Sequence, residues 1–321
     1  MVFVSPTHDG DVKEEWKAWR QGVGVGQLKE RSRVELRGAD RIKLLNNLCT
    51  NDLKRLAVGQ GCEAFLLNVK GHIVGHVWAM CGEESLSLTA APGQAEKLIG
   101  HLDRYIIRED VTLHDTTDQW CHLWLGGPQA LACLQAFIPE LPTERLAWVE
   151  GTVGGAKVIA AKLDYAGPEG YWLQVRDEEA AGVWLALVEA GAVACGDEML
   201  EAARIEWGTP EYGRDISDAN LPQEVARDAL AISFRKGCYL GQETVARIDA
   251  LGHVNQLLVK LRLSELVPEG TELKMGEKVV GRLTSTAVHP EGGVLALGYV
   301  KRGQSQTGTE LMFEGGTAKV V

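Results

Sequence analysis

Residues 234–247 hold the densest group of side chains that could do chemistry, in the order Phe-Arg-Lys-Gly-Cys-Tyr-Leu-Gly-Gln-Glu-Thr-Val-Ala-Arg. Cys238 has the cations Arg235 and Lys236 beside it and a predicted helix start at residues 241–243 after it. Cations and the positive end of a helix both favour a thiolate over a thiol. The residues therefore predict a reactive Cys238, although a small buried thiol fits the local sequence equally well.

A second polar segment, residues 203–215, contains Glu206 next to an apolar stripe with helical spacing. A carboxylate in that place either caps a helix or binds a ligand through adjacent N–H donors, and it needs a partner if it is buried. In the first segment, Glu243 and Arg247 lie four residues apart. That spacing fits an ordinary helix-surface ion pair worth ~0.3 kcal/mol.

The composition excludes several kinds of site. The seven cysteines include no C-x-x-C pair, so neither a disulfide framework nor a closed zinc site is expected. His72 and His76 share one face of a predicted strand but lack a third ligand, so no metal site is predicted. The net charge of −11 argues against a protein that coats DNA or RNA by neutralising phosphates.

The chain shows no pattern typical of export or membrane insertion. Residues 1–20 are charged and lack an apolar segment of the kind found in secretory signals. No apolar run reaches the length that a membrane span needs. Together with the unpaired cysteines, these features predict a cytoplasmic protein in a reducing compartment.

The elements that must position the polar segments alternate between helix and strand as far as residue 250. We expect helices at 11–20, 41–48, 93–105, 128–137 and 177–189, and strands at 33–37, 64–67, 73–78, 85–89, 120–125, 158–161 and 170–175. Residues 68–71 predict a hairpin turn, and the glycine-rich residues 22–26 predict a flexible turn. From residue 256 onward, short strands between glycines predict a small β-barrel. The order predicts an α+β protein with one region at 1–250 and a barrel at 251–321.

The segment Lys236-Gly237-Cys238-Tyr239-Leu240-Gly241-Gln242-Glu243, followed by Arg247, strongly resembles the signature of the YgfZ family of folate-binding proteins. That family is related to the T-protein, the aminomethyltransferase of the glycine cleavage system. Further segments resemble family elements, namely 48–53, 68–77, 204–208, 281–285 and 296–300. The resemblance covers residues 28–321.

The resemblance implies a cloverleaf of three lobes, with two α+β lobes around a central tetrahydrofolate site and a C-terminal antiparallel barrel. Glu206 matches the T-protein glutamate that contacts the pterin ring, and a carboxylate can accept two hydrogen bonds from pterin N–H groups. Three arginines are candidates for the carboxylates of the folate tail, on charge alone: Arg214, Arg227 and Arg235. The resemblance further makes Cys238 and Lys236 candidate catalytic residues and adds five candidate folate-binding residues: Arg204, Trp207, Gln242, Glu243 and Arg247.

Two departures from the T-protein pattern bear on the reaction. Gly75 and His76 stand where the T-protein hairpin has aspartates, one of which is required for aminomethyl transfer. Trp172 stands where a second family carboxylate falls. Both losses argue against glycine-cleavage activity, whether or not the protein is an enzyme of another kind.

The leading hypothesis is therefore a tetrahydrofolate-binding factor that assists the assembly, repair or maintenance of iron–sulfur proteins. Its partners would be a reduced folate and iron–sulfur client or assembly proteins, and any link to tRNA modification would be indirect. The alternative is a folate-dependent aminomethyltransferase or one-carbon transferase in which His76, with an ordinary pKa near neutrality, replaces the lost base. A folate-binding module without thiol chemistry is a third possibility.

Overall fold

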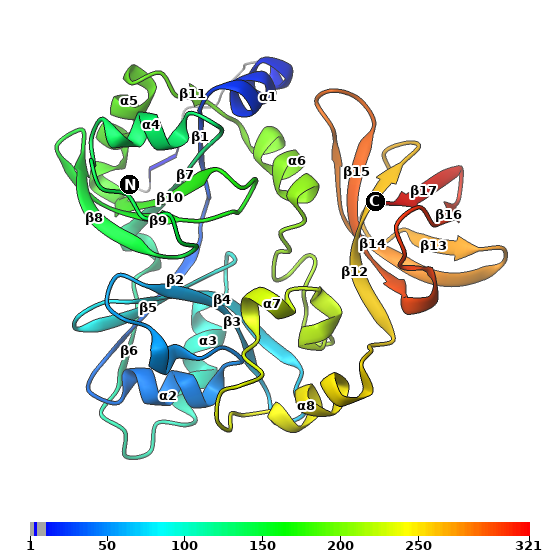
Figure 1. Ribbon diagram of the computed structural model, residues 1–321, viewed down its shortest axis with the longest axis horizontal. Coiled ribbons are helices and arrows are strands. Elements are labelled where there is room, and N and C mark those ends of the chain that lie inside the picture. The colour runs from blue at the N-terminus through cyan, green and yellow to red at the C-terminus, as the bar shows by residue number, and fades with distance from the viewer. Residues whose placement is uncertain (1–2, 5–10) are drawn as a thin grey trace.

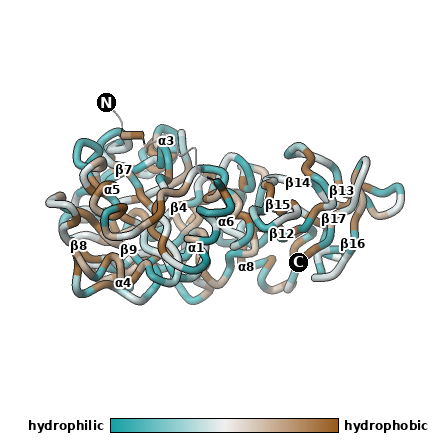
Figure 2. The backbone as a smooth tube through the Cα atoms, turned by 90° about the horizontal axis from the view of Figure 1, so that it is seen from above, coloured by the Kyte–Doolittle hydropathy of each residue, from teal (hydrophilic) through white to brown (hydrophobic). Residues whose placement is uncertain are grey.

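The computed structural model describes residues 3–4 and 11–321 and divides into three lobes (Figure 1). Two lobes combine a sheet with helices, and the third is a closed barrel. Figure 2, turned by 90°, shows the barrel at one end of the long axis and the two α+β lobes together at the other. The predicted α+β class with a C-terminal β-barrel is confirmed. No helix within the described ranges is both long enough and apolar enough to cross a membrane.

The first lobe is a five-stranded antiparallel sheet in the order β3-β4-β5-β2-β6. Its strands are β2 (Ser32–Arg37), β3 (Gly61–Leu67), β4 (Ile73–Cys81), β5 (Ser85–Ala90) and β6 (Thr112–Asp115). Helices α2 (Arg41–Leu48) and α3 (Ala95–Asp103) pack on one face. Successive side chains point to opposite faces of a strand, so Leu66 packs against these helices while Phe65 packs toward the centre of the molecule.

The second lobe is a six-stranded sheet in the order β11-β1-β7-β10-β9-β8. Its strands are β1 (Gly24–Gln27), β7 (Trp120–Gly126), β8 (Trp148–Val153), β9 (Ala156–Lys162), β10 (Gly170–Arg176) and β11 (Val193–Ala194). Its helices are α1 (Val12–Gln21), α4 (Ala130–Gln135) and α5 (Ala180–Glu189). The chain enters this lobe, leaves it for the first lobe after β1, and returns at β7, so the lobe is discontinuous in sequence.

The predicted flexible turn at residues 22–26 is wrong, because Gly24 and Gly26 lie in strand β1. Both glycines are in a crowded place. A Cβ atom on Gly24 would come within 2.7 Å of Cys195 Sγ, and one on Gly26 within 2.4 Å of Leu200 Cδ1. The glycines therefore allow α6 and its preceding loop to pack closely on the sheet, and the segment needs no flexibility.

The third lobe is a closed antiparallel barrel of six strands in the order β12-β15-β14-β13-β16-β17. Its strands are β12 (Gln256–Leu263), β13 (Glu272–Met275), β14 (Lys278–Val288), β15 (Val294–Lys301), β16 (Glu310–Phe313) and β17 (Gly316–Val320). Three helices join it to the other lobes: α6 (Asp197–Trp207), α7 (Asp228–Ala231) and α8 (Gln242–Leu251). Both polar segments of the sequence therefore lie on the connection between lobes (Figure 1).

The hairpin turn at 68–71 packs against the start of α8, which brings two segments of the family resemblance together. Thr244 Oγ1 donates to the Lys70 carbonyl oxygen at 2.9 Å. Gly241, with φ +77°, is so close that a Cβ atom there would lie 2.6 Å from the Asn68 carbonyl oxygen. Gly241 is thus required by backbone conformation and by backbone contact.

We expect Gly241→Ala to lower the free energy of unfolding by about 1–2 kcal/mol or more, because a left-handed residue with a side chain is strained and its Cβ meets backbone. Urea unfolding followed by tryptophan fluorescence measures the change. Gly237→Ala is the matched control in the same segment, since a Cβ atom at residue 237 would have no neighbour within 4 Å among the described residues. Equal stability of the two variants would contradict this account of Gly241.

Candidate functional site

An open groove of about 1220 Å³ lies between α1, α6 and the β14–β15 turn. This volume suits a small-molecule ligand, since such sites commonly have ~300–1000 Å³. The charged and aromatic residues that line it are Trp16, Lys13, Lys17, Arg20, Asp197, Glu198, Glu201, His289 and Glu291. The groove therefore offers an aromatic ring, several cations and several carboxylates.

One wall of the groove presents unmatched N–H donors. The rings of Trp16 and His289 meet edge to face at 4.7 Å between centroids. Trp16 Nε1 is buried without a hydrogen-bond partner among the described residues. His289 Nδ1 accepts from the backbone N–H of Glu291 at 3.1 Å, so the ring proton lies on Nε2, which also has no hydrogen-bond partner there. Trp16 Nε1 therefore lacks an acceptor, whereas His289 Nε2 faces Glu206 Oε1 at 3.5 Å.

Glu206 lies at the edge of this wall. Its carboxylate is 3.5 Å from Arg20 Nη1 and 3.5 Å from His289 Nε2, and its side chain is 30% exposed. Arg20 also stacks over the Trp16 ring at 5.3 Å. Glu206 and the exposed Trp207 line a second pocket of about 210 Å³, which Arg20 borders as well. Of the predicted folate-binding residues, Glu206 contacts two residues that line the groove, Arg20 and His289, but itself lines the second pocket.

The centre of the molecule is almost filled. The space bordered by Arg31, His76, Tyr165 and Tyr212 measures about 10 Å³. A cavity of that size holds about one water molecule. Aromatic rings occupy the rest, since Trp78 contacts both Tyr165 and Trp172 at 5.8 and 5.3 Å between centroids. This space is far smaller than the groove beside α1.

Arg204 is fully buried and all its donors are used. Its five N–H groups bond to Glu201 at 2.6 and 2.9 Å, to Asp215 at 2.8 Å, to Ser285 at 2.9 Å and to the Thr209 carbonyl oxygen at 2.6 Å. A guanidinium has five such donors. The predicted folate contact of Arg204 therefore has no free donor, and Arg204 instead ties α6 to the barrel.

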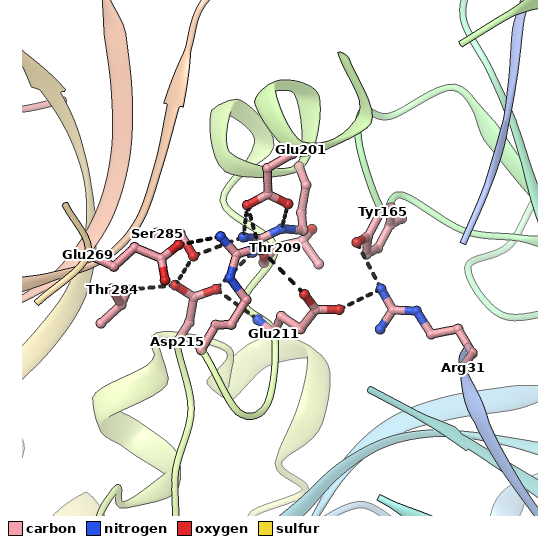
Figure 3. A network of polar contacts seen from close by, with 11 residues as sticks. Arg31, Tyr165, Glu201, Thr209, Glu211, Asp215, Glu269, Thr284 and Ser285 are labelled. Atoms are coloured by element: carbon pink, nitrogen blue, oxygen red, sulfur yellow. Dashed lines mark hydrogen bonds and ion pairs between the residues drawn. The ribbon is translucent and has the colours of Figure 1, made fainter. Parts of the chain in front are cut away.

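The same network extends across the three lobes (Figure 3). Asp215 accepts from Thr284 and Ser285 of the barrel at 2.6 and 2.7 Å. Arg31, which precedes β2, donates to Tyr165 of the second lobe at 2.9 Å and pairs with Glu211 at 2.8 Å. Each lobe thus supplies at least one member of the network.

None of the predicted tail-binding arginines is among the residues that line the groove, although Arg214 contacts the groove residue Glu201. Arg214 pairs with Glu201 at 2.8 Å and also with Glu269. Arg227 bonds to Glu63 through Nε at 2.8 Å and Nη2 at 2.6 Å. Arg235 is exposed on the loop before α8. Charge alone did not distinguish these structural or surface arginines from Lys13, Lys17 and Arg20, which do line the groove.

A buried charge cluster that the sequence did not reveal surrounds Glu63. This carboxylate is fully buried and also accepts from Arg145 at 2.5 Å and contacts His76 Nε2 at 2.8 Å. Burial alone would raise the pKa of Glu63, but Arg227 and His76 hold this pKa well below its ordinary value. Because the ionised carboxylate accepts from Nε2, that ring nitrogen carries a proton.

Cys238 is the exposed cysteine among the seven, as its predicted reactivity requires. Cys62 is half-buried and the other five are buried. Burial raises the pKa of Cys49 to about 11 and that of Cys121 to about 12. A thiol with so high a pKa is largely protonated near neutral pH and is a poor nucleophile.

Lys236 does not act as predicted beside Cys238. Its ammonium is buried and donates to the carbonyl oxygens of Asn46 at 2.6 Å, Cys49 at 2.8 Å and Asn51 at 2.6 Å. These three bonds use all three ammonium donors. The prediction that Lys236 activates the Cys238 thiol is therefore wrong, because Lys236 fastens the loop to the first lobe.

The remaining predicted folate ligands lie on α8, outside the groove lining. Glu243 and Arg247 are exposed and Gln242 is half-buried. The described residues show no ion pair between Glu243 and Arg247, although their spacing allows one.

The sequence carried weak indications of two sites that were not predicted from it. An amphipathic helix with two tryptophans precedes the first strand, and it carries the groove residues Trp16 and Arg20. Glu63 is a carboxylate inside an apolar strand, which indicates a buried charge.

The fold and the sequence matches define the class of protein. The crystal structure of the glycine cleavage system aminomethyltransferase T from Bartonella henselae superimposes with a TM-score of 0.84, covering 97% of this chain and 88% of that one at 20% identity. The chain thus has the fold of that aminomethyltransferase. Residues 3–236 match the family model of the GCVT N-terminal domain, and the protein belongs to that family.

Curated relatives are similar along nearly the whole chain. An aminomethyltransferase from Rippkaea orientalis is 29% identical over 324 residues, which cover 96% of this chain and 86% of the relative. An aminomethyltransferase from Thermus thermophilus is 29% identical, covering 94% of this chain and 86% of the relative. A chloroplastic protein of Arabidopsis thaliana named as a putative transferase is 29% identical, covering 95% and 71%.

We expect Asp215→Ala to lower the free energy of unfolding by about 3 kcal/mol, because it removes the fully buried counter-charge of Arg204 Nη1 and leaves buried hydrogen-bond donors of the network unmatched. Chemical unfolding monitored by circular dichroism tests this. Glu269→Ala removes a half-exposed member of the same network, and its effect should stay below about 1 kcal/mol. A small effect of Asp215→Ala would mean that the network does not hold the barrel in place.

Proposed function

We propose that this protein binds a reduced folate in the groove between α1, α6 and the β14–β15 turn. The observation that carries the proposal is the wall formed by Trp16, His289 and Glu206. Trp16 and His289 line the groove of about 1220 Å³, Trp16 Nε1 has no hydrogen-bond partner among the described residues, and the Glu206 carboxylate lies 3.5 Å from His289 Nε2. Membership of a family whose relatives are named aminomethyltransferases supports a folate as the ligand.

The groove residues match the chemistry of a pterin with an acidic tail. The Glu206 carboxylate can accept from the amino and ring N–H groups, as charge-assisted bonds. Trp16 Nε1 and His289 Nε2 can donate to ring acceptor atoms. Positive charge for the tail carboxylates comes from the three cations that line the groove, Lys13, Lys17 and Arg20. These cations replace the arginines that were predicted for the tail from charge alone.

The comparisons favour one role for the bound folate, which is aminomethyl or one-carbon transfer of the T-protein type. Reduced folates carry one-carbon units in such reactions. In this chain the hairpin aspartates are replaced, and His76 with Glu63 is the acid–base pair at that place. His76 Nδ1 can hold a proton while Glu63 orients the ring. His76 borders the small central space, so this role requires that space to open during reaction.

A second role is favoured by Cys238 and by the lost aspartates. In this hypothesis the protein belongs to the YgfZ branch and assists iron–sulfur proteins. The exposed thiol of Cys238 lies in the segment that carries the resemblance, and a soft thiolate ligand suits transient contact with iron or sulfur. Iron–sulfur client proteins would then be the partners. A cytoplasmic location stays a prediction.

We expect Glu206→Gln to weaken the binding of folinic acid about tenfold or more, because a charge-assisted hydrogen bond contributes ~1.5–3 kcal/mol. Quenching of tryptophan fluorescence should report binding, since Trp16 lines the groove. Glu243→Gln provides the comparison, as it removes an exposed carboxylate of α8. If only Glu243→Gln weakened binding, the folate site would lie at α8 and the groove assignment would be wrong.

We expect Cys238→Ser to lower iron–sulfur enzyme activity in cells, and the wild-type protein to be inactive in a reconstituted glycine-cleavage assay. The reason is that the hairpin lacks the T-protein carboxylate while the thiol is accessible. His76→Ala is the matched variant for the other role. Turnover that His76→Ala abolishes and Cys238→Ser leaves intact would establish the transferase instead.

A further inference from the structure

A cavity of about 270 Å³ lies where α8 meets the first strand of the barrel, away from the groove. Gln223 and Asp228 border it on one side, and Asp249 of α8 borders it on another. Ile248, Val254 and Leu257 supply an apolar wall. None of these residues has a part in the folate site, the lobe-linking network or the Cys238 loop as described above.

Two of the residues that border this cavity, Gln223 and Asp228, each carry a buried hydrogen-bond acceptor that has no donor among the described residues. Gln223 is 6% exposed, and its Nε2 donates to the Val245 carbonyl oxygen at 2.8 Å. This bond identifies the other amide atom as Oε1, which is buried and has no hydrogen-bond partner among the described residues. Asp228 Oδ1 is likewise buried and unpartnered within the same ranges. Two independent acceptors are therefore left without donors beside one cavity.

The carboxylates that border the cavity also lack a paired cation among the described residues. Asp228 and Asp249 form no ion pair within 4.0 Å in the part of the chain that the structure describes. Burial and the repulsion from Asp249 both disfavour the ionised carboxylate of Asp228. Burial and then Asp249 raise the pKa of Asp228 to about 6. Arg302 and His253 also border the cavity, and both are exposed to water. A ligand that brings positive charge and N–H donors would satisfy what the protein leaves unmatched.

We propose that this cavity binds a primary alkylammonium group, with the NH₃⁺ directed to Gln223 Oε1 and the carboxylates of Asp228 and Asp249. Its methylene chain would pack on the apolar wall of the cavity. An ammonium offers three donors, which matches three acceptor side chains. A metal ion is the poorer match, because the described residues contain no group of three or more His, Cys, Asp or Glu side chains suited to one.

The ligand chemistry has two sources, a free diamine or the lysine side chain of a partner protein. Isothermal titration calorimetry of the full chain with putrescine and with Nα-acetyl-lysine amide distinguishes them. Binding of both indicates a general ammonium site, and binding of the lysine derivative alone indicates a partner side chain. Either result supports the proposal, provided that neutral n-butanol does not bind.

Asp228→Asn is the decisive variant. It keeps the shape of the side chain and removes a charge that has no partner among the described residues, so the protein should fold, as a thermal unfolding scan would verify. We expect amine binding to weaken at least tenfold, as expected from loss of a charge-assisted bond of ~1.5–3 kcal/mol. Asp103→Asn, at an exposed carboxylate of α3, should leave binding unchanged.

Three results would overturn the proposal. The first is the absence of binding heat with either amine. The second is amine binding that Asp228→Asn leaves unchanged. The third is tight binding of magnesium chloride that Asp228→Asn abolishes while the amines fail to compete, which would identify the site as a cation site of another kind. Folate binding in the groove is measured separately, so failure here does not bear on it.

Discussion

The buried ion pair between Arg204 and Asp215 is the interaction on which the arrangement of the three lobes depends. A buried charge is expensive unless it is paired and hydrogen-bonded, and here every donor of Arg204 is used. The partners lie on α6, on the loop after it and on the barrel strand β14. Satisfying Arg204 therefore requires the barrel to dock against α6, and that docking forms one wall of the groove.

The position of the open groove follows from how the two sheets bury their faces. Alternate residues of β4 and β7 pack toward helices, and the others, including Trp78 and Trp124, pack between the lobes. Large rings at those positions fill the centre of the molecule. The open volume is consequently displaced to the rim, beside α1, where the carboxylate of Glu206 lies.

The segment around Cys238 has a structural as well as a chemical reason for its sequence. Lys236 anchors it to three carbonyl oxygens of the first lobe, and Gly241 allows contact with the 68–71 turn. These two contacts hold the loop by its ends while Cys238 stays exposed between them. A rigid loop that presents one thiol suits a protein that meets a partner there.

The sequence alone determined the α+β class, most helices and strands and the C-terminal barrel, because hydrophobic periodicity and turn residues are local properties. It singled out Cys238 by its motif, but the exposure of this thiol was decided by the tertiary structure. The sequence did not determine the partners of charged residues. Three cations, Arg204, Arg227 and Lys236, look alike in the sequence. In the structure each binds partners of the protein itself, so its donors are not free for a ligand. The sequence also did not predict strand β1. Its glycines are needed because α6 and the loop before it pack closely on this strand, and that contact is not visible in the sequence. Which charges remain free for a ligand is decided by tertiary packing, since only packing brings a buried charge to its counter-charge and leaves the others facing an open groove.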